Sequence, residues 1–187
     1  MILSSQFFDS DVKIVGTNPS ETVKQNLQAG AKQEEILPPE LQQKAVQLGK
    51  IIATEYCNAG EQFLDATGDS ADAELLLQRQ LLLSFTVTVG FERFCSQAVA
   101  GYAQKSFLDE LNNISHKLYQ NSTDTGAFSF YYLAYRHYNE VERRMGQTFA
   151  MLCSHDGDPI YQELGEALYC WFSSLIEKNC KALGLAQ

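Results

Sequence analysis

The amino-acid sequence predicts an all-α protein, a single-domain antiparallel helical bundle of about five main helices with a short irregular N-terminal arm. Two observations predict this class. Apolar residues recur at steps of three, four and seven over most of residues 39–187, which is the period of an amphipathic helix. The four prolines all fall where these stretches begin or break. Because the connections between the stretches are short, neighbouring helices are expected to run antiparallel.

The N-terminal arm is predicted over residues 1–38, which are the least regular part of the sequence. Residues 11–15 have the character of a short extended segment that ends at Gly16. Asn18 and Pro19 then form a suitable cap and first-turn pair for a short helix over about 20–28. We expect this arm to pack either on the main domain or on a partner.

The helical bundle domain is predicted over residues 39–187, and its first helix ends near Thr67. A second helix, over about 71–103, is apolar on nearly all sides and is therefore expected at the centre. Within it, residues 84–89 alternate in polarity and are rich in β-branched side chains, which is typical of strands. Strong helix formers flank these six residues on both sides, so we assign them to the helix.

The third and fourth helices follow from two further apolar stripes. The third stripe extends from Phe107 to Leu118 and ends at the polar run 120–126. The fourth extends from Tyr131 to Leu152 and is interpreted as one continuous helix.

The fifth helix has the clearest end signals of the chain. Residues 153–156 (CSHD) resemble a nucleophile beside a base, but adjacent residues at a helix end seldom face each other in attack geometry. We interpret them as part of a turn in which Asp158 caps the helix and Pro159 is its first residue. The helix should end near Gly184.

Composition and charge exclude several functional classes. The formal net charge is −9, whereas a nucleic-acid or acidic-membrane surface needs a basic footprint, so neither is expected as a partner. The longest uncharged apolar-leaning stretch, between Arg79 and Glu92, is shorter than the roughly 20 residues of a membrane span. The first residues lack the basic start and apolar run of a signal peptide. We therefore expect a soluble cytoplasmic protein.

The five cysteines show neither metal-binding nor disulfide patterning. They are odd in number, widely spaced and without a CxxC pair. Most lie among apolar residues, so we expect them to be small buried side chains.

Three carboxylates fall on apolar stripes: Glu55, Glu92 and Glu142. An ionised carboxylate there is costly unless it is paired or binds a metal. One hypothesis gathers the three, with His137, in a polar pocket that holds a metal or exchanges protons with a small ligand. The Glu-x-x-His motif of bundle metal proteins is absent, and only the reversed order His137-x-x-Glu140 occurs. The alternative is structural, with each glutamate paired to a cation or tyrosine hydroxyl or reaching water.

Aromatic residues crowd the beginning of the fourth predicted helix. They are Phe128, Phe130, Tyr131, Tyr132, Tyr135 and Tyr138. Such residues suit an apolar ligand cavity with a few hydroxyls, a homodimer face, or an ordinary helical core.

The leading functional hypothesis is a non-enzymatic module, homodimeric, that binds a small apolar or aromatic ligand or a protein partner. No complete catalytic constellation, phosphate loop or zinc-protease helix is present in the sequence. The candidate ligand-pocket residues are Glu55, Glu92, Tyr131, Tyr135, Tyr138 and Glu142. The alternative is a metal-binding or acid/base enzyme that uses Glu55, Glu92, His137 and Glu142. The sequence leaves the cofactor undetermined, and a bound metal is not the favoured interpretation.

Overall fold

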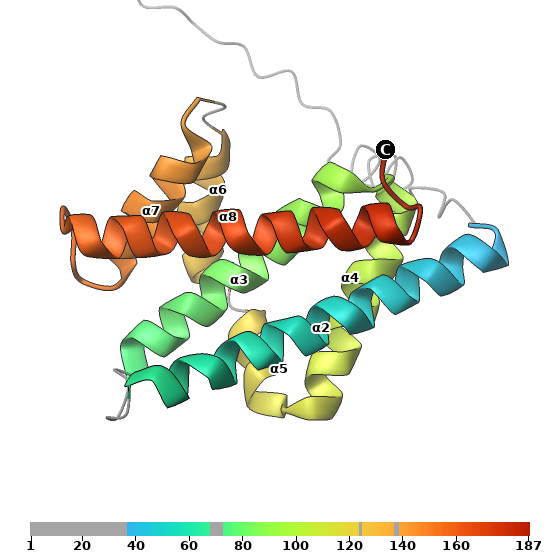
Figure 1. The fold of residues 1–187 in the computed structure, drawn as a ribbon, viewed down its shortest axis with the longest axis horizontal. Helices are drawn as coiled ribbons and strands as arrows, with labels where there is room; N and C mark the ends of the chain where they lie inside the picture. Colours follow the sequence, from blue (N-terminus) through green and yellow to red (C-terminus); the bar gives the residue numbers. More distant parts are fainter. Residues whose placement is uncertain (1–36, 68–72, 124, 137–138) are drawn as a thin grey trace, which may run out of the picture. The chain divides into compact units, whose positions relative to one another are not determined.

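The computed structural model describes residues 37–67, 73–123, 125–136 and 139–187, which belong to one compact unit, Glu35–Gln187. These residues form helices and no strand (Figure 1), so the all-α class is confirmed. The seven described helices are α2 (Pro39–Thr67), α3 (Ala73–Phe94), α4 (Gln97–Ile114), α5 (His116–Ser122), α6 (Thr125–Arg136), α7 (Val141–Leu152) and α8 (Pro159–Ala182). All of the predicted N-terminal arm except its last two residues lies outside the described residues.

Two predicted helices are interrupted by serines, which is one reason why the expected number of about five was too low. Instead of extending to residue 103, α3 ends at Phe94, and α4 begins after Ser96, whose Oγ accepts a hydrogen bond from Val99 N at 3.4 Å. Ser115 caps α5 in the same way, with Leu118 N as the donor. A serine cap satisfies a backbone N–H at the start of a new helix, so an apolar stripe can continue across the break.

The predicted fourth helix is divided into α6 and α7. The residue before α7, Glu140, has φ of 60° and lies in the left-handed region. A right-handed helix cannot continue through this conformation. The rotation of α7 about its own axis is therefore independent of α6.

The helical assignment of residues 84–89 is confirmed. Thr86 Oγ1 donates a hydrogen bond to Leu82 O at 2.8 Å, and Thr88 Oγ1 donates one to Ser84 O at 3.2 Å. The hydroxyls of both threonines therefore donate to backbone carbonyls of the preceding helical turn. Tertiary burial on all sides of α3 overrides the strand preference of the segment.

The described residues contain two clusters of buried apolar side chains, and α3 contributes to both. Leu83 and Val87 lie in the first cluster, which α3 shares with α2, α4 and the end of α8. Leu82 and Phe85 lie in the second, which it shares with α6, α7 and the first half of α8. Helix α8 packs along both α3 and α7 (Figure 1). Among the described helices, none has the length and apolar character needed to cross a membrane.

Candidate functional site

A groove with a volume of about 260 Å³ lies between α6 and α7 and opens to solvent. Three large apolar side chains that line it are exposed, with exposed fractions of 47% for Phe130, 61% for Leu133 and 41% for Met151. The other lining residues are Ala134, Arg144, Gln147 and Thr148. We call this feature the α6–α7 groove.

Helix α6 has this exposed apolar face because it carries large apolar residues on both sides. Tyr131 and Tyr135, four residues apart, pack into the second core cluster. Phe130 and Leu133, three residues apart, line the groove instead. A helix that is apolar all round is normally buried on every side. The groove face of α6 is therefore as apolar as a helix face that another protein surface covers.

The tyrosines of α6 lie around Phe85 of α3 and do not line the groove; Tyr131 is buried, Tyr135 is half-buried and Tyr132 is exposed. The ring centroids of Tyr131, Tyr132 and Tyr135 lie 5.4, 5.0 and 6.2 Å from that of Phe85, and Phe128 adds a fourth ring at 5.8 Å. Tyr131 is fully buried, and its hydroxyl has no hydrogen-bond partner within the described residues. Burial raises the pKa of Tyr131 far above its ordinary value.

Two of the three predicted inward carboxylates are exposed, which corrects that expectation. Glu92 and Glu142 lie on the surface and Glu55 is half-buried. Glu142 was predicted to face inward because residues 131–152 were interpreted as one continuous helix. The helix is instead broken before α7, so Glu142 lies in the first turn of a new helix. A carboxylate there is favoured by the helix dipole. Glu92 stands two residues before the end of α3, where a long side chain can reach water.

The described residues do not assemble the predicted metal site. Glu55 lies on α2, which packs against α3, α4 and α8, and α2 makes no contact with α6 or α7 in the described part of the chain. Across those same residues, no group of three or more His, Cys, Asp or Glu side chains could hold a metal ion. His137 and Tyr138 lie outside the described residues.

Glu142 acts electrostatically on a tyrosine, Tyr169 of α8, that sequence reasoning did not select. Burial is the main cause that raises the pKa of Tyr169 to about 12, the neighbouring Tyr135 and Glu142 raise it further, and Arg93 lowers it. A phenol with this pKa keeps its proton at neutral pH, so it can donate a hydrogen bond but cannot serve as a base. The arrangement therefore favours a structural role for Tyr169.

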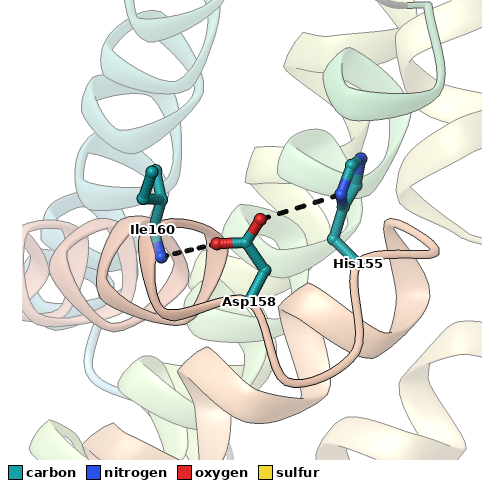
Figure 2. Close-up of polar contacts among 3 residues, drawn as sticks. All are labelled: His155, Asp158 and Ile160. Carbon is teal, nitrogen blue, oxygen red and sulfur yellow. Dashed lines mark hydrogen bonds and ion pairs between the residues drawn. The ribbon is translucent and has the colours of Figure 1, made fainter.

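The turn between α7 and α8 has the predicted helix cap and no catalytic geometry. Figure 2 shows Asp158, whose Oδ1 accepts a hydrogen bond from Ile160 N at 2.9 Å and whose Oδ2 lies 4.0 Å from His155 Nδ1. The His155 ring stacks on Tyr161 with 3.8 Å between centroids. Cys153 is buried. The histidine and the aspartate are thus both used to fix the turn.

Sequence reasoning noted Phe130 among the aromatics but missed Leu133, Gln147 and Met151 as site residues. One signal was available in the sequence. Helix α6 is apolar on the face of Phe130 and Leu133 as well as on the face of Tyr131 and Tyr135, and only one of these faces can pack into the bundle. Arg144 adds a polar wall to the groove. Its Nε is buried and has no hydrogen-bond acceptor in the described part of the chain.

Comparison with known proteins gives no relative from which a function could be transferred. No protein-family model, curated protein or solved structure matches the chain.

Proposed function

We propose that the protein is a non-enzymatic protein-interaction module whose α6–α7 groove binds apolar side chains of a second copy of the chain, forming a homodimer. The observation that carries this proposal is the exposure of Phe130, Leu133 and Met151 along one groove. Scattered exposed apolar residues are normal, but several gathered in one place mark interaction sites.

The size of the α6–α7 groove favours a protein partner over a small apolar or aromatic ligand. Small-molecule sites enclose roughly 300–1,000 Å³ and bury most of the ligand surface. This groove has about 260 Å³ and opens to solvent. Such a shape suits one or two side chains that project from a larger surface, because the rest of the partner then covers the rim.

A second copy fits because the same surface offers both a hollow and protruding side chains. In a twofold dimer each subunit contributes the same patch, so Leu133 of one copy can enter the groove of the other. Phe, Met and Arg, which are enriched in interfaces, all line this groove. A carbonyl or carboxylate of the second copy would also supply an acceptor for the guanidinium of Arg144.

Native mass spectrometry and sedimentation velocity at micromolar concentration test the proposal. The wild-type chain is expected to be a dimer, and Leu133→Glu a monomer because its carboxylate would be desolvated in the interface. Ile114→Glu is the matched control, since Ile114 is also exposed (50%) but lies on α4, outside the groove. This control is expected to remain dimeric, and circular dichroism should show native helix content in both variants.

Salt dependence provides a second readout. Each copy has a formal net charge of −9, so the two copies repel each other and added salt should tighten the dimer. A wild-type chain that stays monomeric at low and high salt would contradict the homodimer. A dimer that survives Leu133→Glu but dissociates with Ile114→Glu would place the interface on α4.

A further inference from the structure

Two buried cysteines from distant parts of the sequence meet at one end of the first core cluster. Cys95 follows the last residue of α3, and Cys180 lies in the last turn of α8. A hydrogen bond of 3.4 Å joins their Sγ atoms. The two side chains are 2% and 0% exposed. Both are free thiols.

The spacing is close to that needed for a covalent bond. A disulfide has an S–S distance of about 2.05 Å, so the sulfurs have to approach by roughly 1.4 Å. Cys95 lies between two helices, where the backbone can adjust more readily than inside a helix. Its partner is anchored in α8, so the required movement falls mainly on the α3–α4 junction.

We propose that Cys95 and Cys180 form a reversible thiol–disulfide site that a peroxide oxidises, tying the end of α8 to the α3–α4 junction. The proposal is independent of the homodimer, because neither cysteine lines the α6–α7 groove.

The chemistry balances with one peroxide. The Cys95 thiolate attacks an oxygen of hydrogen peroxide, the O–O bond breaks, and a sulfenic acid and hydroxide form. The Cys180 sulfur then attacks the sulfenic sulfur, the S–S bond forms, and the second hydroxide leaves. The two thiol protons convert both hydroxides to water, so two thiols lose two electrons and the peroxide gains them.

The environment assigns the two sulfurs different roles. The hydrogen bond between the two Sγ atoms lowers the pKa of Cys95, although burial opposes this, whereas the same contact and burial raise the pKa of Cys180. The thiolate is the nucleophile in peroxide oxidation. Cys95 is therefore the thiol that reacts first and Cys180 the one that resolves the sulfenic acid.

Residues 185–187 are hydrogen-bonded to the backbone beside the pair. Leu185 N donates a hydrogen bond to Cys180 O at 2.9 Å, and Gln187 N donates one to Phe94 O, beside Cys95, at 3.1 Å. A small oxidant such as hydrogen peroxide reaches a buried pair through local opening of the surrounding structure, whereas bulky thiol reagents are hindered.

Peptide mapping of the full wild-type chain after mild hydrogen peroxide treatment tests the site without any variant. The expected product is a peptide pair linked through Cys95 and Cys180 that has lost two hydrogens. The half-buried Cys57 and Cys170 are internal controls and should remain unlinked to either. The proposal is overturned if Cys95 and Cys180 remain thiols, or reach sulfinic acid singly, while the controls react.

Thermal unfolding provides an independent readout, because the crosslink closes a long loop between residues 95 and 180. The oxidised wild-type chain should melt roughly 5–15 °C higher than the reduced one, and a dithiol reductant should reverse the shift. Cys180→Ser should abolish the shift, and Cys170→Ser should retain it. A peroxide-induced shift that persists in Cys180→Ser would overturn the assignment.

Discussion

A single added methyl group at Gly146 tests how closely α7 and α8 pack. A Cβ at this position would lie 2.2 Å from the backbone oxygen of Gln162 in α8, whereas ordinary contact begins at 3.4 Å. One helix must therefore move by about 1.2 Å. Overpacking of this kind costs roughly 1–3 kcal/mol, and the helix propensity of alanine returns about 1 kcal/mol. Because the obstructing atom is backbone and cannot rotate away, we expect a cost at the upper end of this range and a net loss of ~2 kcal/mol for Gly146→Ala.

Urea and thermal unfolding followed by circular dichroism measure this loss. For a domain of this size ~2 kcal/mol lowers Tm by roughly 4–8 °C. The matched control is Gly101→Ala on α4, where an added Cβ meets nothing within 4 Å. This control should gain roughly 0.5–1 kcal/mol from helix propensity alone. Equal stability of the two variants would refute the close approach of α7 and α8.

Three further changes test other contacts. Ser96→Ala removes the cap that accepts from Val99 N and should cost roughly 0.5–2 kcal/mol in urea unfolding. Tyr56→Phe removes the buried hydroxyl that bonds Ser122 Oγ at 3.2 Å, and should cost roughly 1–3 kcal/mol. Stability should fall as pH rises from 10 to 12, because unfolded Tyr169 loses its proton near pH 10 whereas the buried phenol keeps it to about 12. Tyr169→Phe should reduce this fall.

A specific outcome would contradict each of these three predictions. A stable Ser96→Ala variant would mean that the α3–α4 break does not depend on the cap. No loss in Tyr56→Phe would mean that the hydrogen bond between Tyr56 and Ser122 contributes nothing to stability. An unfolding free energy with the same slope above pH 10 in the wild type and in Tyr169→Phe would mean that Tyr169 titrates alike in both states.

The sequence predicts those elements whose ends carry their own chemistry. Helix α8 starts at Pro159, with Asp158 as its cap, and Gly184 follows its end with φ of 67°, all as the local residues indicate. The start of α2 at Pro39 is equally well marked. In these places the hydrogen bonds and backbone angles depend on residues within one turn of the helix end, so no tertiary information is needed.

Breaks inside continuous apolar stripes were not predicted, and they account for the errors in the candidate site. Ser96 and Ser115 interrupt stripes whose period continues on both sides. The break before α7 changes the direction of every later side chain, including Glu142. Because a face is assigned by counting along an unbroken helix, one unseen break is enough to move a carboxylate from core to surface. The α6–α7 groove could not be predicted for the same reason, because it forms only where the predicted single helix is divided into α6 and α7.

Helix α3 belongs to both core clusters, and this has a consequence for cooperativity. Neither cluster can lose its packing without exposing one side of the same helix, so the two halves of residues 35–187 are expected to unfold in a single transition. Amide hydrogen exchange should then be slowest along α3, at the global unfolding free energy, and faster in the seven-residue helix α5. Helix α3 thus joins the two core clusters into one cooperative unit of unfolding.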